Sequence, residues 1–253
     1  MRFSFVILTW NRCRFLEQCL NSLFRSIADL QGSEIIVLDN GSDDGTHNIL
    51  GAFGEAKSLR LISRVRNNGL NAYKRLFGAA SGDYIVDVDD DVLEFPVGID
   101  QILAEYMKTF QDYGFIALNV VQNELTNGAR PALEEYIEET RNGKTILRGP
   151  TGGWCACFRR SEFKKIQKDF LSADLHMVYG EDTFLTANFE QRLSLKSGII
   201  RDVYCLHASG PEYAKRYGHL DREIEKYANS NLDTFVEDYQ KYRDAGKENA
   251  SQS

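Results

Sequence analysis

The sequence lacks the features of a membrane-spanning, secreted or nucleic-acid-binding protein. The apolar run at its start, residues 3–8, is too short for a signal peptide or a transmembrane helix. The chain has 30 basic residues against 37 acidic ones, and this net charge of −7 argues against a nucleic-acid partner held by broad electrostatics. No stretch resembles a polybasic membrane patch. We therefore expect a cytoplasmic protein.

Cysteine is scarce and irregularly spaced. The five cysteines are Cys13, Cys19, Cys155, Cys157 and Cys205. An odd number without regular spacing does not suggest a disulfide framework, and the pair at 155 and 157 has no second pair with which to complete a zinc site. We expect all five to pack as small hydrophobic side chains.

Glycine-rich phosphate-binding motifs are missing as well. The loop after the first apolar run reads Thr9-Trp10-Asn11-Arg12, without the glycines of a dinucleotide-binding fingerprint, and the chain has no P-loop. It also has no internal repeat and no flexible interdomain linker. With 253 residues, of which 43% are hydrophobic and 26% charged, it can form one large globular domain, alone or with an appendage.

Apolar runs alternate with helix-forming segments over the first 92 residues. The runs lie at 3–8, 34–38, 59–63 and 82–88. This alternation predicts an α/β fold in which helices flank a mostly parallel central sheet. The polar clusters that follow the runs would meet beyond the carboxyl ends of the strands, where ligands bind in such sheets.

The fourth run ends in three consecutive aspartates, Asp89, Asp90 and Asp91. Adjacent carboxylates repel one another, so the cluster needs water or a cation to neutralise it. Carboxylate oxygens select Mg²⁺, Mn²⁺ or Ca²⁺ rather than zinc. Taken alone, these residues fit a solvated acidic loop as well as a cation site.

The pattern becomes less regular beyond residue 92. The segment 122–144 is polar, and within it the acidic string 134–139 indicates a solvated helix face. The glycine-rich stretch 148–158 allows a ligand close to the backbone, although a plain hairpin needs paired glycines equally. From about residue 219 onward we expect amphipathic helices.

Two further polar positions have simple structural explanations. Glu181 and Asp182 begin a helical stretch, and acidic residues at a helix start are favoured by the macrodipole. His207 ends the last convincing strand, where a lone histidine is commonly a partly buried side chain without a ligand.

Taken in order, these motifs resemble glycosyltransferase family 2, the inverting nucleotide-sugar transferases with the Rossmann-like GT-A fold. The resemblance extends from Phe3 to His207. It rests on seven segments in the expected order: 5–12, 36–46, 68–69 with Arg75, 80–85, the aspartates 89–91, 159–163, and 180–182 with His207. No single motif is decisive, but the series is specific.

The resemblance implies a role for each matching residue. The nucleotide would be held by Thr9, Asn11, Asp39, Asn68, Arg75 and Asp90. A divalent ion, Mn²⁺ or Mg²⁺, would be held by Asp89, Asp91 and His207. Asp182 would be the catalytic base, and Gly153, Trp154 and Glu181 would lie near the donor or acceptor sugar.

The chain departs from the family pattern at two points. The asparagine that often follows the arginine at position 75 is absent, which leaves the details of donor binding open. Asp87 also permits an alternative register in which Asp87-Val88-Asp89 is the metal motif. Strand alternation and the position of Tyr84-Ile85 favour the later register.

The resemblance also divides the chain into parts. We expect a catalytic domain at 1–210, with a nucleotide-binding half at 1–92 and an acceptor-binding half at 93–210. A helical extension at 211–245 and a disordered tail at 246–253 would follow. Nothing in the sequence indicates an oligomeric state.

The reaction implied is metal-dependent, inverting transfer of a sugar from a nucleotide donor, UDP-linked by family habit, to a hydroxyl of a glycan or lipid-linked acceptor. A lipid-linked acceptor would bring the chain to a membrane surface, and the tyrosines and basic residues of its C-terminal part either contact that membrane peripherally or form a packed helix face. A sugar-1-phosphate nucleotidyltransferase is the alternative enzyme, although residues 9–12 do not form its glycine-rich phosphate loop. A non-catalytic nucleotide-sugar-binding module is a third reading, against which Asp182 argues.

Overall fold

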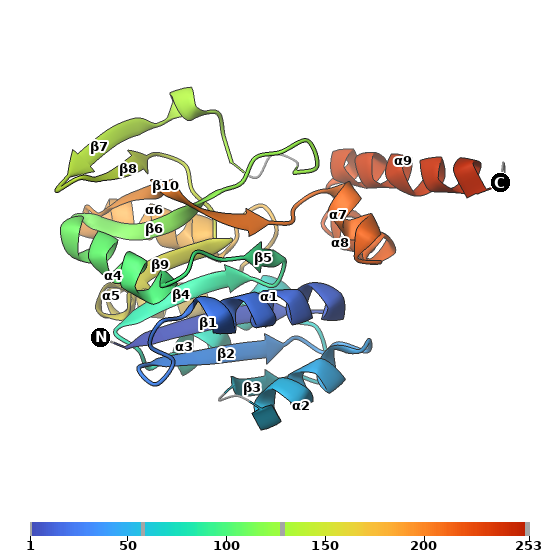
Figure 1. Cartoon of the computed structure of the whole chain (residues 1–253), viewed down its shortest axis with the longest axis horizontal. Coiled ribbons are helices and arrows are strands. Elements are labelled where there is room, and N and C mark those ends of the chain that lie inside the picture. The colour runs from blue at the N-terminus through green and yellow to red at the C-terminus, as the bar shows by residue number, and fades with distance from the viewer. Residues whose placement is uncertain (1, 57–58, 127–129, 251–253) are drawn as a thin grey trace. The chain divides into compact units, whose positions relative to one another are not determined.

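The computed structural model describes residues 2–56, 59–126 and 130–250 (Figure 1). The chain divides into two compact units. The larger unit comprises Met1–Val121 and Arg130–His207, and the smaller one comprises Gln122–Ala129 and Ala208–Ser253. The domain boundary expected at residue 210 stays a prediction.

A single sheet forms the centre of the larger unit. Its strands are β1 (Phe3–Thr9), β2 (Ser33–Asp39), β3 (Leu59–Ser63), β4 (Tyr84–Asp89), β5 (Val92–Glu94), β6 (Tyr113–Val120), β7 (Ile137–Arg141), β8 (Lys144–Arg148), β9 (Cys155–Arg159) and β10 (Lys196–His207). Their order is β3-β2-β1-β4-β9-β6-β10-β8-β7, and β5 pairs with the end of β10. The strands from β3 to β4 are all parallel, whereas β9 runs antiparallel between β4 and β6.

Helices cover both faces of this sheet, which explains why its central strands consist mostly of buried apolar residues. The helices are α1 (Cys13–Ser26), α2 (Thr46–Ala56), η1 (Gly69–Ala72), α3 (Tyr73–Ala79), α4 (Ile99–Thr109), η2 (Leu133–Glu135), α5 (Arg160–Ser172) and α6 (Glu181–Leu193). On one face, the carboxylate of Asp100 in α4 accepts hydrogen bonds from the backbone N–H groups of Ala28 and Asp29, directly after α1.

A cluster of phenylalanines fills the other face. Phe77 of α3 lies at the centre, with its ring centroid 5.4 Å from that of Phe158 in β9 and 5.4 Å from that of Phe170 in α5. Phe170 in turn contacts Phe184 of α6 at 5.2 Å. Each fully buried ring stabilises the fold by about 1.5–3 kcal/mol, so this cluster fixes α3, α5 and α6 against the sheet.

The strand register brings several loops to one edge. Thr9 of β1 is paired with Asp39 of β2, and Leu8 is paired with Asp89 of β4, so three parallel strands end side by side. β10 reaches the same edge because its last residue, His207, is paired with Val92 of β5. The prediction of a mostly parallel central sheet flanked by helices is confirmed.

The acidic string 134–139 is not a helix as expected. Only a short 3-10 turn, η2, forms before Ile137 begins β7, which pairs with β8 as an antiparallel hairpin. Asn142 and Gly143 connect the two strands with φ angles of 51° and 74°. An Asn-Gly pair is the commonest sequence of such two-residue turns, so its local signal outweighed the charge pattern.

The smaller unit contains α7 (Pro211–Arg216), α8 (Leu220–Asn229) and α9 (Asp233–Ala250). Ala214, Ile224 and Tyr239 form its core, with Tyr227 packed against them. A packed helix face is therefore what the structure shows for Tyr227. α9 is helical as far as Ala250, into the segment expected to be a disordered tail, and residues 251–253 lie outside the described residues.

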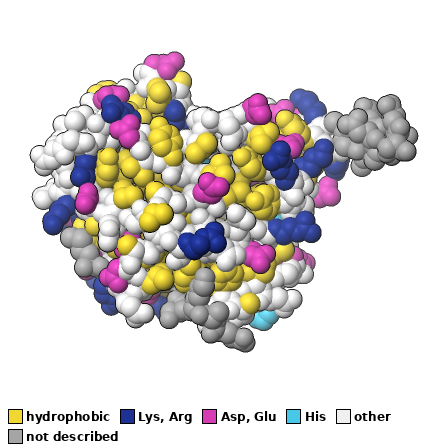
Figure 2. All heavy atoms as spheres, viewed as in Figure 1, with side chains coloured by type: hydrophobic (Ala, Val, Ile, Leu, Met, Phe, Trp, Pro, Cys, Tyr) yellow, Lys and Arg dark blue, Asp and Glu magenta, His cyan; other side chains and the backbone are white. Residues whose placement is uncertain are grey.

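Within the described ranges, no helix is both long enough and apolar enough to cross a bilayer. On the face drawn in Figure 2, basic and acidic side chains are interspersed among apolar ones. This mixing agrees with the composition, in which 30 basic residues nearly balance 37 acidic ones.

Candidate active site

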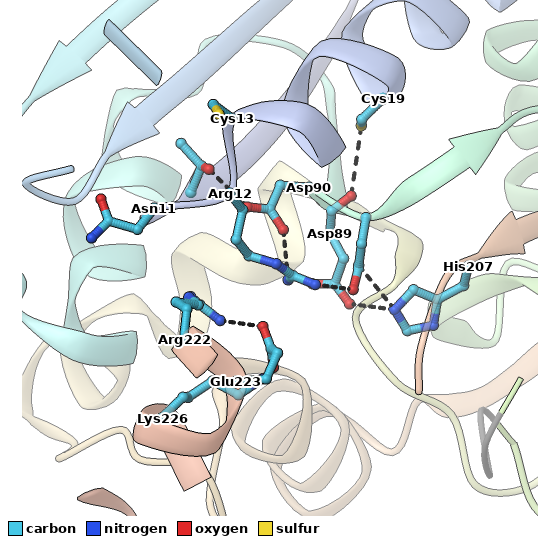
Figure 3. Close-up of polar contacts among 12 residues, drawn as sticks. Asn11, Arg12, Cys13, Cys19, Asp89, Asp90, His207, Arg222, Glu223 and Lys226 are labelled. Atoms are coloured by element: carbon cyan, nitrogen blue, oxygen red, sulfur yellow. Dashed lines mark hydrogen bonds and ion pairs between the residues drawn. The ribbon is translucent and has the colours of Figure 1, made fainter. Parts of the chain in front are cut away.

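Asp89, Asp91 and His207 meet at the edge where β4, β5 and β10 converge. Nε2 of His207 is 3.1 Å from Oδ1 of Asp91 and 3.4 Å from Oδ2 of Asp89. One ligand atom from each residue lies within 4.8 Å of the other two. Figure 3 shows the imidazole of His207 directed toward Asp89. Two carboxylate oxygens and one imidazole nitrogen are ligands that Mn²⁺ accepts. The residues present therefore fit a divalent cation.

The charges of this cluster reinforce that interpretation. Burial raises the pKa of Asp89 to about 6, with His207 opposing the shift and the neighbouring carboxylates adding to it. Burial would also raise the pKa of Asp91, but Arg12 and His207 outweigh it and hold this pKa well below its ordinary value. Asp91 and Asp89 raise the pKa of His207 against the effect of burial. The site therefore favours positive charge between its two carboxylates.

Asp90, between the two candidate ligands, is engaged on both sides. Its Oδ2 accepts a hydrogen bond from the Thr9 hydroxyl at 2.7 Å, and its Oδ1 pairs with Nη1 of Arg12 at 2.8 Å. Arg12 also pairs with Oδ2 of Asp91 at 2.5 Å. Arg12 had no predicted role, although the sequence contains a signal for one. Three adjacent carboxylates at the end of one strand need a positive charge nearby, and Arg12 follows the neighbouring parallel strand β1.

The predicted nucleotide-binding residues at the ends of β1 and β2 occupy adjacent loops. Oδ1 of Asp39, which is buried, accepts a hydrogen bond from the backbone N–H of Ser42 at 2.9 Å. Asn11 has a positive φ of 52°, and its side chain exchanges hydrogen bonds with Asp43 across the two loops. These hydrogen bonds hold the two loops to each other.

The two remaining predicted nucleotide residues lie further along the chain. The backbone N–H of Asn68 donates to Oδ1 of Asn40, which ties the loop before η1 to the end of β2. Arg75 lies on the exposed side of α3, and among the described residues no hydrogen bond or ion pair joins it to the site. The structure therefore brings Asn68 close to the end of β2, whereas no described contact connects Arg75 to the other predicted nucleotide-binding residues.

Asp182 is connected through Gly153 and Trp154 to the candidate cation site of Asp89, Asp91 and His207, which we call the metal corner. The backbone N–H of Gly153 donates to Oδ2 of Asp182 at 3.3 Å. The next carbonyl, that of Trp154, accepts the backbone N–H of Asp89 at 3.0 Å, and the Trp154 ring lies 6.2 Å from the His207 ring. Two consecutive residues thus set the position of the candidate base relative to the candidate ligands.

Asp87 and Glu181 form another pair of buried carboxyl groups. A Cβ atom built on Gly153 would lie 3.2 Å from Oδ2 of Asp87 and 3.1 Å from Oε1 of Glu181. Burial raises both pKa values well above the ordinary range, and each is raised further by neighbouring carboxylates. Asp87 is fully buried, and neither of its oxygens has a hydrogen-bond partner among the described residues. Among the described residues, the cluster that could hold a metal ion consists of Asp89, Asp91 and His207 and does not include Asp87. The choice between the two registers stays a prediction.

Comparison with known proteins shows which family has this pattern. The sequence profile of glycosyl transferase family 2 matches residues 4–167. A validoxylamine A glucosyltransferase from Streptomyces hygroscopicus subsp. jinggangensis is 25% identical over 178 residues, which cover 70% of this chain and 41% of that protein. The enzyme of the same name from subsp. limoneus is 24% identical over 178 residues, covering 70% of this chain and 38% of its own length. The chain thus spans about two fifths of these relatives' length.

Solved structures are similar over most of this chain. A mannosyltransferase from Pyrobaculum calidifontis, solved with GDP-Man and Mn²⁺, has a TM-score of 0.60 and 15% identity and covers 97% of this chain and 74% of its own. S. aureus TarS 1-349, solved with UDP, has a TM-score of 0.63 and 14% identity. The match covers 91% of this chain and 66% of the TarS chain. At such identities the likeness concerns the fold alone, and it confirms the predicted GT-A fold.

Proposed function

Because the chain belongs to glycosyl transferase family 2, we propose that it transfers a sugar from a nucleotide-sugar donor to a hydroxyl group of a glycan or lipid-linked acceptor. We propose a UDP-linked donor. This choice is supported by TarS structures solved with UDP and with UDP-GlcNAc, although the mannosyltransferase structure contains GDP-Man. One of the relatives is a validoxylamine A glucosyltransferase, which supports transfer of a hexose.

The observation that carries the proposal is the connection between base and metal corner. Gly153 donates its N–H to Asp182, and Trp154 accepts the N–H of Asp89. A transferase needs an acceptor-activating base and a leaving-group-stabilising centre in a defined relation, because the sugar must lie between them. A sheet edge with carboxylates alone would not impose that relation.

Asp89, Asp91 and His207 are the residues that would hold the divalent ion. Bound there, Mn²⁺ or Mg²⁺ would neutralise the charge that develops on the diphosphate as the glycosidic bond breaks. Thr9, Asn11, Asp39, Asn68 and Arg75 would surround the nucleoside, and Asp90 stands next to this group through its bond to Thr9. Binding of the nucleotide would require Arg75 to approach from the exposed side of α3.

Asp182 would accept the proton of the acceptor hydroxyl as that oxygen attacks the anomeric carbon. Its carboxylate is oriented by the N–H groups of Gly153 and Thr183, the latter at 2.6 Å from Oδ1. Attack opposite the leaving diphosphate inverts the anomeric configuration in one displacement. Glu181 and the Trp154 ring, beside this carboxylate, would contact the donor or acceptor sugar.

Replacing Asp182 by asparagine tests this assignment. The change keeps the size of the side chain but removes the base, so transfer should fall by about 10²–10⁴-fold, while nucleotide binding stays within about twofold. The measurement is release of free nucleotide from a panel of nucleotide sugars with Mn²⁺, together with nucleotide affinity. Asp174→Asn, a change outside the site, is the matched control. Normal turnover by the Asp182→Asn protein would refute the base assignment.

A further inference from the structure

The guanidinium group of Arg12 joins two of the three consecutive aspartates. Nη1 pairs with Oδ1 of Asp90 at 2.8 Å, and Nη2 pairs with Oδ2 of Asp91 at 2.5 Å (Figure 3). Only 12% of the Arg12 side chain is exposed, and its Cζ lies 4.8 Å from the centre of the Phe15 ring. A planar fork stacked on an aromatic ring has little rotational freedom, so Arg12 fixes the orientation of both carboxylates.

This arrangement gives the carboxylate oxygens different environments. Both oxygens of Asp90 have partners, because Thr9 donates to Oδ2 while Arg12 pairs with Oδ1. Oδ2 of Asp91 accepts a hydrogen bond from Arg12. The buried Oδ1 of Asp91 lies 3.1 Å from Nε2 of His207, but it accepts no hydrogen bond from any described residue. Oδ1 of Asp91 is thus turned toward the candidate metal position.

We propose that Arg12 is a positioning residue that divides the three carboxylates into one anchor and two metal ligands. It holds Asp90 away from the ion as the anchor, and it restricts Asp91 to coordination through Oδ1 alone. The inference rests on the proposed function, because it concerns the metal site assigned there. Residues that orient metal ligands by hydrogen bonds typically contribute about 10–100-fold to metal affinity.

A purely electrostatic role for Arg12 predicts the opposite effect. A guanidinium beside a cation site repels the cation, so removing that charge without other changes should tighten binding. Positioning requires the fork geometry, so either loss of the charge or its replacement by a single ammonium group should weaken binding. The two explanations therefore differ in the sign of the change.

The test is a titration of the full chain with Mn²⁺ alone, in which electron paramagnetic resonance measures the free ion. Arg12→Lys keeps the charge without the fork, and Arg12→Met keeps the apolar stem without the charge. Both should weaken Mn²⁺ binding by about tenfold or more. Arg14→Met, on an exposed side chain two residues away, is the matched control and should bind within about twofold of wild type.

Arg12→Met removes the guanidinium partner of two buried carboxylates and is the variant most at risk of unfolding. Circular dichroism checks its fold, and Arg12→Lys tests the proposal independently of it. Wild-type affinity in Arg12→Lys, or tighter binding in folded Arg12→Met, would overturn the positioning role while leaving the metal site standing. If wild type itself did not bind Mn²⁺, the metal site of the proposed function would fail, and this inference with it.

Discussion

At the scale of single residues, Asp90 and Asp91 differ more than their adjacency suggests. Asp90 has a partner at each oxygen, whereas Asp91 keeps one oxygen toward His207. The sequence predicts that carboxylates collect at this edge, because a buried strand ends in them. It does not predict which of them faces a ligand, because that choice depends on Arg12, which precedes Asp90 by 78 residues.

Gly153 is a residue whose small size the site requires. In Gly153→Ala, the added methyl group would meet Glu181 Oε1 at 3.1 Å and Asp87 Oδ2 at 3.2 Å, so both buried carboxyl groups must move. We expect the free energy of unfolding to fall by about 1–3 kcal/mol, measured by urea denaturation. Transfer should fall further than stability explains, because the Gly153 N–H orients Asp182.

Gly51→Ala is the control for this substitution. A Cβ at Gly51, in α2, would meet no atom within 4 Å, so alanine should be neutral or stabilise the protein by up to about 1 kcal/mol. If Gly153→Ala and Gly51→Ala changed the free energy of unfolding equally, the carboxyl groups of Asp87 and Glu181 would not restrict the space at Gly153.

At the scale of elements, the β7–β8 hairpin shows where sequence reasoning fails. The helix expected at 134–139 came from the charge pattern, but the Asn142-Gly143 turn and the pairing with β8 decided the structure. The parallel strands of the first half were predictable because each is a local apolar run followed by a helix. The insertion of β9 between β4 and β6 was not, since it depends on pairings between distant segments.

The same hairpin is fastened to the start of β6 by a charged cluster. Asp112 pairs with Arg141 of β7, with Nη2 to Oδ2 at 2.8 Å, and with Lys196 of β10 at 3.1 Å. The hydrogen bonds from Arg141 hold the pKa of Asp112 well below its ordinary value of 3.8. Since the group is partly exposed, water screens the interaction, and we expect Asp112→Asn to cost about 0.2–1 kcal/mol at pH 7.

This contribution should depend on pH with a definite sign. A carboxylate whose pKa is lowered in the folded state stabilises the protein above its unfolded pKa, and that stability is lost as the pH falls toward the native pKa. The difference in unfolding free energy between wild type and Asp112→Asn should therefore be smaller at pH 3 than at pH 7. Asp202→Asn, which removes an exposed ion pair with Arg201, is the control. Its unfolding free energy should differ little from that of wild type at either pH. A difference for Asp112→Asn that does not shrink at pH 3 would argue against the ion pair.

At the scale of the whole molecule, residues from β1 to β10 of the larger unit make up the candidate site. His207 ends β10 and meets Asp91 because β5 pairs antiparallel with that strand. Motif order along the chain predicted that Asp89, Asp91 and His207 belong to one site, and the structure places these three side chains together. The roles that family resemblance gives them stay predictions. The connection through Gly153 and Trp154 could not be read from the sequence, because it is made by backbone groups.

Binding of a divalent cation by Asp89, Asp91 and His207 is tested most directly by anomalous diffraction from crystals grown with Mn²⁺ and UDP. We predict one strong manganese peak bounded by Oδ2 of Asp89, Oδ1 of Asp91 and Nε2 of His207, at coordination distances of about 2.0–2.3 Å, between those of Mg²⁺ and Ca²⁺. Asp90 should remain bound to Thr9 and Arg12. A manganese peak at Asp87 and Glu181, or ordered UDP without manganese at the three residues, would contradict the account.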